Sequence, residues 1–330
     1  MNKTRRSTLR LALAATAMAT GMMSGTATAQ ANAWPNRPIR LIVPSAAGGA
    51  ADFVARTFSA FLQKRLPANA AVVVENRPGA GGIIGTEAAK SAPADGYTFL
   101  IASNSTHAAN VSLYRNLPYD PIKDFAPVGM FGTFGTILVV PKNSPFKSLP
   151  ELIRYAKAHP GNMTYGYYSS SSRVPPELLR VRAGLDYAGA PYRNITQIIT
   201  DMLGGQIQFA FLDSLSAAPA LQNPMLAPIA VTSSQRMPQL ASVPTVAESL
   251  QGFEVQGWLG LTAPAGTPED VVKRMSTLVS DAISEPAIRT ALERQGMAPR
   301  TMTPEALRAH MVADRSRWAE WTKAAGIEPE

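Results

Sequence analysis

Two adjacent glycines, Gly48 and Gly49, stand where an apolar run gives way to a segment of helical periodicity. Residues 39–43 are typical of a buried parallel strand, and apolar residues then recur at helical spacing from Val54 to Phe61. The first N–H groups of a helix lack partners inside the helix and carry the positive end of its dipole, so they bind anions such as carboxylates. Glycine lets a ligand approach this backbone closely. The segment is therefore either an anion site or an ordinary turn between strand and helix.

Asp52, at the start of this helix, admits two interpretations. An acidic residue in the first turn stabilises the helix dipole, which favours a structural role, and the alternative is a ligand contact. The candidate ligand contacts on this segment are Ser45, Ala46, Ala47, Gly48, Gly49 and Asp52.

Two further expected strands end in polar or glycine-rich segments. Residues 71–74 are followed by glycines at 79, 81 and 82, and residues 97–102 are followed by a polar run that includes Ser105, Thr106 and His107. Ligands in open α/β sheets bind at the carboxyl ends of strands, so we expect these three polar residues near the first candidate segment. The glycine cluster matches neither the dinucleotide fingerprint nor a P-loop, and we interpret it as a wide turn rather than a direct ligand contact.

The second half of the chain repeats this arrangement. An expected strand at 163–168 is followed by a serine run and then Arg173, which either binds a carboxylate bidentately or is a solvated surface arginine. Asp213 follows an expected strand at 207–212 and either accepts a hydrogen bond from a ligand hydroxyl or ammonium group or caps the next helix. The candidate contacts in this half are Ser169, Ser170, Ser171, Ser172, Arg173 and Asp213.

No pattern of catalytic residues accompanies these segments. The chain has no cysteine and no G-x-S-x-G sequence, and its three histidines, His107, His159 and His310, lie far apart in the sequence. A zinc site needs at least three clustered ligands, and no such spacing occurs. We therefore expect a protein that holds an anion without transforming it, with no metal and no cofactor.

The first 29 residues have the pattern of a signal peptide. Four basic residues precede an apolar, alanine-rich run, and small residues favour cleavage after Ala29 or Ala33. We expect export to the periplasm, by either the general or the twin-arginine route. Without these residues, four of the 31 bases are lost, leaving 27 bases against 23 acids, a net charge of about +4. Such a mild surplus gives no case for nucleic-acid binding.

Alternating strands and helices predict an α/β protein. A second α/β unit begins with a helix at 149–158, and an expected strand at 254–263 leads back to the first unit. Two helices are expected to finish the chain, each starting at a proline behind a threonine cap, Thr267 and Thr303. A mature chain of this length has room for two cores.

Nine stretches along the mature chain carry short sequence motifs: residues 34–52, 74–82, 93–98, 105–114, 191–192, 201–206, 230–233, 243–248 and 263–268. Each motif is weak alone, but together and in this order they are specific. The set resembles the Bug (Bordetella uptake gene) receptors of tripartite tricarboxylate transporters.

The resemblance implies a two-lobed, type II periplasmic-binding-protein (Venus-flytrap) fold, each lobe a mixed sheet flanked by helices. One lobe comprises residues 34–136 and 251–330, and the other comprises residues 137–250. It further implies a monomeric receptor that captures a dicarboxylate, tricarboxylate or aromatic acid between its lobes and delivers it to membrane transporter subunits. The alternatives are a receptor for a two-component sensor kinase and, as a weaker one, an exported hydrolase.

The chain departs from the family pattern at several candidate contacts. Ser45 and Ala47 replace a usual phenylalanine and proline, Arg173 occupies the place of a usual histidine, and Asn194 replaces a glycine. The first anion site is expected to be intact, whereas ligand selection by the second lobe is expected to be unusual.

Overall fold

The computed structural model describes residues 34–68 and 70–330, and Arg37–Glu330 forms one compact unit. The expected signal peptide and both expected cleavage positions lie outside the described residues. The helices are α2 (Ala50–Arg65), α3 (Ile83–Lys90), α4 (Asn110–Leu113), α5 (Leu149–Ala158), α6 (Ser170–Ala183), α7 (Ile195–Leu203), α8 (Ser214–Ala220), α9 (Glu269–Ser284), α10 (Pro286–Arg294) and α11 (Pro304–Ala324), with short turns η1 (Ala80–Gly82), η2 (Ser105–Ala109), η3 (Pro238–Leu240) and η4 (Val246–Glu248).

The strands build one continuous mixed sheet in the order β2-β1-β3-β9-β4-β7-β5-β6, with β8 and β10 also paired to β4. Their bounds are β1 (Ile39–Val43), β2 (Val72–Asn76), β3 (Thr98–Ser103), β4 (Phe125–Pro141), β5 (Thr164–Tyr167), β6 (Ala188–Pro191), β7 (Phe209–Asp213), β8 (Leu226–Val231), β9 (Gln256–Pro264) and β10 (Met297–Pro299). Strands β1, β2 and β3 are parallel to one another, while β9 is antiparallel to β3 and β4.

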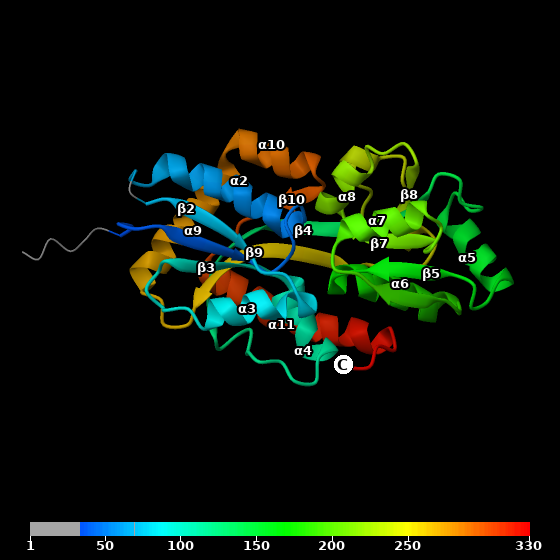
Figure 1. The fold of residues 1–330 in the computed structure, drawn as a ribbon, viewed down its shortest axis with the longest axis horizontal. Coiled ribbons are helices and arrows are strands. Elements are labelled where there is room, and N and C mark those ends of the chain that lie inside the picture. Colours follow the sequence, from blue (N-terminus) through cyan, green and yellow to red (C-terminus); the bar gives the residue numbers. More distant parts are fainter. Residues whose placement is uncertain (1–33, 69) are drawn as a thin grey trace, which may run out of the picture. The chain divides into compact units, whose positions relative to one another are not determined.

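The long strand β4 belongs to both halves of this sheet. Its residues 125–135 pair with β9, and its residues 136–141 pair with β7 and β8. We call the strands on either side of this change of partners the first sheet (β2, β1, β3, β9, β10) and the second sheet (β7, β5, β6, β8). In Figure 1, α2 and α10 lie along one side of the first sheet and α3 and α11 along the other. An α/β fold with a mixed sheet flanked by helices is therefore confirmed.

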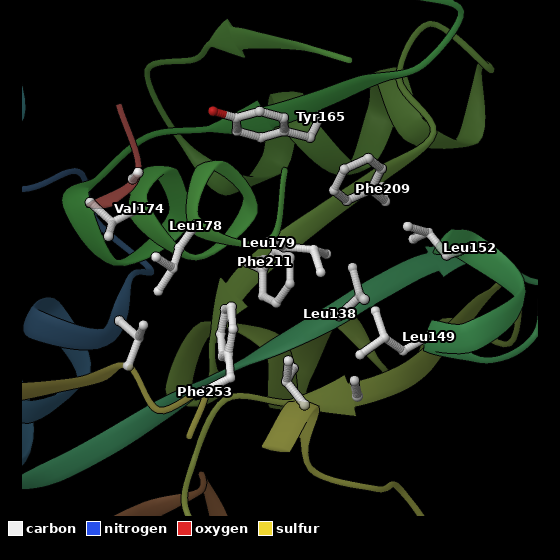
Figure 2. Close-up of a cluster of buried hydrophobic side chains, with 14 of the residues drawn as sticks. Leu138, Leu149, Leu152, Tyr165, Val174, Leu178, Leu179, Phe209, Phe211 and Phe253 are labelled. Carbon is white, nitrogen blue, oxygen red and sulfur yellow. The ribbon is translucent and has the colours of Figure 1, made fainter. Parts of the chain in front are cut away.

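The largest buried cluster packs α5 and α6 against β4, β5 and β7. Phe209 and Phe211 of β7 are fully buried, and Figure 2 shows Leu178 and Leu179 of α6 next to them. Burial of a leucine or phenylalanine side chain stabilises a fold by about 1.5–3 kcal/mol, so this cluster fixes α6 on the second sheet. The start of α6, which carries the serine run, is thereby held at the carboxyl end of β5.

Most expected elements occur, and two expectations need correction. The serine run begins a helix, because Ser169 caps α6 and the following serines form its first turn. Three helices, not two, finish the chain, since Glu285 and Pro286 separate α9 from α10. Thr303 caps α11 as expected, but the Thr267 hydroxyl donates to the Pro264 carbonyl and does not cap α9. Within the described ranges, none of the helices is long and apolar enough to cross a membrane.

Candidate functional site

A cavity of about 640 Å³ lies where strand ends of the two sheets face each other. One side is formed by the segments that follow β1, β2 and β3, and the other by the start of α6, the end of β7 and the segment that leads into α7. The lining residues are Pro44, Ser45, Ala46, Ala47, Gly49, Ala50, Ala51, Pro78, Gly79, Ala80, Gly81, Gly82, Ser103, Asn104, Ser105, Thr106, Phe134, Tyr168, Ser169, Ser171, Tyr192, Arg193, Asn194, Ile195, Asp213 and Leu259.

The head of α2 opens onto this cavity. Gly48 has a φ of +81°, a left-handed conformation that residues with a side chain rarely adopt, and this turn leads the chain into the helix. The N–H of Ala50 donates to the Ser216 hydroxyl at 3.1 Å. Among the residues that the structure describes, the N–H groups of Ala51 and Asp52 have no hydrogen-bond acceptor. The first turn of α2 therefore keeps the unpaired donors that an anion needs.

Asp52 stabilises the turn before α2 through its carboxylate and does not line the cavity. Its carboxylate accepts from the Gly48 N–H at 3.0 Å, from Arg56 at 2.9 Å and from Asn76 at 3.0 Å. Burial alone would raise the pKa of Asp52, but these hydrogen bonds outweigh it and hold the pKa below its ordinary value. The carboxylate is thus ionised, paired with a cation and used to shape the turn.

The glycine-rich turn after β2 lines the cavity through residues 79–82. It forms the short turn η1 and leads into α3, where a Cβ atom on Gly85 would lie only 2.7 Å from the Pro44 Cα atom. Gly85 therefore lets α3 pack directly against the end of β1. Our interpretation as a wide turn without ligand contact overlooked that this turn forms part of the cavity wall.

The polar run after β3 divides between cavity and core. Ser105 and Thr106 line the cavity, whereas His107 is fully buried and packs its ring against Phe125, with the ring centroids 4.9 Å apart. Its Nδ1 atom forms a hydrogen bond with the Thr106 hydroxyl at 2.9 Å. Burial lowers the pKa of His107 to about 3, so the ring is neutral. His107 does not reach the cavity.

Hydrogen bonds join the start of α6 to the segment after β3. The Asn104 amide donates to the Ser171 hydroxyl at 3.0 Å and to the Ser170 hydroxyl at 3.3 Å, and Ser105 and Ser170 share a hydrogen bond of 2.7 Å. The Asn104 side-chain oxygen accepts from the backbone N–H of Trp258 at 3.2 Å, which links this contact to β9. Asn104 therefore links the two sides of the cavity, although our sequence interpretation did not include it among the contacts.

The other members of the serine run have structural partners or a place in the wall. Ser169 and Ser171 line the cavity, while Ser170 lies behind it in the contact with Ser105. The Ser172 hydroxyl accepts from the Ser169 N–H at 2.9 Å, and these two residues form a reciprocal capping box. Ser172 therefore stabilises the start of α6 and does not line the cavity.

Arg173 does not line the cavity. Its guanidinium pairs with the Glu330 carboxylate at 2.5 Å and lies over the Tyr167 ring. The cation that lines the cavity is Arg193, in the exposed segment before α7. A signal for Arg193 is present in the sequence, because Arg193 follows a strand end as Arg173 does, but β6 has no clear apolar pattern.

Asp213 lines the cavity from the carboxyl end of β7. Its side chain is buried and its Oδ2 atom accepts from the Tyr168 hydroxyl at 2.6 Å, while its Oδ1 atom is buried without a hydrogen-bond partner in the described part of the chain. Burial raises the pKa of Asp213 to about 6. Although Asp213 directly precedes α8, its side chain makes no capping hydrogen bond, so the capping alternative does not hold.

Three solved structures have a similar fold, and two of them contain a small organic acid. The R. palustris protein Rpa4515 with adipate is 32% identical, with a TM-score of 0.87 over 90% of this chain and 100% of that one. MatC from Rhodopseudomonas palustris with bound malate is 30% identical, with a TM-score of 0.79 over 87% and 99% of the two chains. The periplasmic binding protein BugD is 30% identical, with a TM-score of 0.84 over 90% and 100%.

The fold is therefore that of periplasmic solute-binding proteins, a class of receptors and not of enzymes. Protein BugT of Bordetella pertussis is 32% identical over 302 residues, which are 90% of this chain and 92% of BugT. Residues 54–327 match the model of the tripartite tricarboxylate transporter family receptors. The chain belongs to this family, which confirms the resemblance drawn from its sequence motifs.

Proposed function

We propose that this receptor captures a small organic carboxylate in the cavity and delivers it to membrane subunits of a tripartite tricarboxylate-type transporter. The observation that carries the proposal is the head of α2, beside the cavity, where the N–H groups of Ala51 and Asp52 have no acceptor among residues 34–68 and 70–330. Unpaired amides at the positive end of a helix dipole favour an anion, and a carboxylate offers two acceptor oxygens.

The ligand contacts follow from the lining of the cavity. The first carboxylate lies against the segment before α2, with the polar side chains after β3 and at the start of α6 around it. The proposed contacts, drawn from both sides, are Ser45, Ala46, Ala47, Gly49, Ser105, Thr106, Ser169, Ser171 and Asp213. The bound adipate and malate of the two R. palustris proteins support a carboxylate ligand for this chain as well.

Capture requires that the cavity open and close. We place one lobe at residues 34–136 and 251–330 and the other at residues 137–250, with β4 and the segment that leads into β9 as the crossings between them. A ligand that contacts both lobes stabilises the closed state, and the membrane subunits then recognise that state. The receptor acts as a monomer in the periplasm after cleavage of its signal peptide.

Thermal-shift screening of the mature protein against a library of organic acids tests the proposal. A ligand that binds only the native state raises the melting temperature. At a concentration of about 100 times its Kd, such a ligand adds about 2.7 kcal/mol to the free energy of unfolding. We expect at least one small carboxylate to raise the melting temperature by several degrees and to bind in calorimetry. If no acid does either, carboxylate capture is wrong. Uptake of that acid by cells with the membrane subunits, with and without this protein, then separates transport from sensing.

A further inference from the structure

Asp213 differs from the other buried aspartates in the described part of the chain. Asp52, Asp213 and Asp314 are each at most 6% exposed. Asp52 pairs with Arg56 at 2.9 Å, and Asp314 pairs with Arg317 at 3.1 Å. Burying a carboxylate is costly unless a cation or several donors compensate it. Two of the three carboxylates meet this requirement within the protein.

Asp213 has no such cation among residues 34–68 and 70–330. Its Oδ2 atom accepts from Tyr168 at 2.6 Å and its Oδ1 atom has no partner. The Ser171 hydroxyl also lies close enough to favour the ionised carboxylate and lower its pKa, but less than burial raises it. A neutral hydroxyl does not replace an arginine, so the carboxylate lacks a positive partner, and it is the one of the three that lines the cavity.

Because the missing partner and the ligand cavity coincide, we propose that the ligand itself supplies the cation: the receptor selects carboxylic acids that also carry a protonated amine, whose ammonium group pairs with Asp213. This inference rests on the proposed function and names the class of acid within it. The unpaired amides at the head of α2 hold the carboxylate, while Asp213 on the opposite side of the cavity accepts from the ammonium group.

The remaining charges of the cavity agree with this assignment. Arg193 and Asp213 are the two charged side chains that line it, and Arg193 is exposed. A ligand with a carboxylate at both ends would place one of them near the buried Asp213, where like charges repel in a medium of low dielectric. An ammonium group next to that carboxylate offsets the repulsion and provides the countercharge that Asp213 lacks.

Matched pairs of acids test this inference by calorimetry at pH 7.5. Each pair shares one carbon skeleton, with and without an amino group: succinate and aspartate, glutarate and glutamate, adipate and 2-aminoadipate. We expect the amino member of the best-binding pair to bind at least tenfold more tightly. Malate, which carries a hydroxyl group in place of the amine, is expected to bind more weakly than aspartate.

The variant Asp213→Asn removes the charge and keeps the shape. We expect the ratio of affinities within the best pair to fall at least tenfold in this variant. If the variant does not fold, the ratio of affinities within the best pair, measured on the unsubstituted protein, still tests the inference. Equal or tighter binding of the unsubstituted acids, an unaltered ratio in Asp213→Asn, or malate binding as tightly as aspartate would each overturn the inference. If none of these pairs binds while another acid of the library does, the inference is overturned and the proposed function stands.

Discussion

The two sides of the cavity differ in the chemistry that they present. We call residues 44–51, 78–82 and 103–106 the amide wall, because its lining residues carry no charge and it includes the unpaired N–H groups at the head of α2. We call Tyr168, Ser169, Ser171, residues 192–195 and Asp213 the side-chain wall, which holds both charged residues of the lining. Backbone amides recognise any carboxylate, whereas side chains vary freely with sequence. We infer that the amide wall supplies affinity and the side-chain wall chooses among acids.

The strongest test of this comparison is Gly49→Val in the amide wall. Gly49 has an ordinary backbone conformation, so the substitution adds bulk at the head of α2 without straining the chain. We expect affinity for every acid to fall at least 100-fold, about 2.7 kcal/mol, because the carboxylate no longer reaches the amides. Calorimetry measures the loss. The matched control is Gly204→Val, at an exposed helix end away from the cavity, and an equal loss there would contradict the assignment.

The second test concerns the charge in the side-chain wall and uses protein without ligand. The pKa of Asp213 is about 6 in the folded state and about 3.8 in the unfolded state. Between these values the folded protein holds a proton that the unfolded chain has lost, so folding is favoured at low pH and this contribution is lost as pH rises through 6. We expect the free energy of unfolding, relative to Asp213→Asn, to fall by about 2–3 kcal/mol from pH 4 to pH 7.

Chemical denaturation of both proteins across this range gives that difference directly. Other titrating groups cancel in it, including His107, whose lowered pKa destabilises the folded state at acid pH in both proteins. A difference that stays constant with pH would show that Asp213 is not a buried, unpaired carboxylate.

The third test weakens the contact between the two walls. Asn104 is the residue whose amide bonds Ser170 and Ser171 while its oxygen accepts from Trp258. We expect Asn104→Ala to weaken ligand binding about tenfold, because hydrogen bonds of about 1 kcal/mol each no longer stabilise the closed cavity. Small-angle scattering with saturating ligand should still show closure. Asn223→Ala, on the surface, serves as the control, and a loss there of similar size would exclude a specific role for Asn104.

The smallest effect is expected at Arg173. Its guanidinium pairs with Glu330 and does not line the cavity, so Arg173→Ala should change affinity less than twofold. Arg193→Ala, at the cavity, should change affinity more than Arg173→Ala does. The reverse order of the two variants, measured by calorimetry, would show that Arg173 turns into the cavity when ligand is bound.

Much of the amide wall could be predicted from the sequence, because its position depends on local order. A short apolar strand, a glycine turn and a helical period place Gly48 and Gly49 at a helix head without knowledge of distant contacts. The side-chain wall was harder to predict, since its members are assigned by packing between segments far apart. The sequence does not reveal that the Arg173 guanidinium pairs with the Glu330 carboxylate. It also does not reveal that Asn104 donates hydrogen bonds to Ser170 and Ser171, which lie 66 and 67 positions further along the chain.

His107 and Asp52 show the same limit on a smaller scale. Both are polar and stand at strand or helix ends, where ligand contacts are common. The His107 side chain instead lies in the core, where it packs against Phe125. The Asp52 carboxylate lies in the turn before α2, where it pairs with Arg56. Periodicity locates a residue along an element, but whether a polar side chain at an element's end faces inward depends on the neighbours that tertiary packing brings.

The hydrogen bond from the Ala50 N–H to the Ser216 hydroxyl limits how many N–H groups at the head of α2 are left for ligand oxygens. Ser216 of α8 accepts from the first of the three leading amides, which leaves those of Ala51 and Asp52. Two donors suit the planar, two-oxygen end of a carboxylic acid, whereas a tetrahedral oxyanion such as sulfate would find the third place taken. The Ser216 hydroxyl thus takes the position that a third ligand oxygen would need. Ser216→Ala would free the Ala50 N–H and let such ions bind.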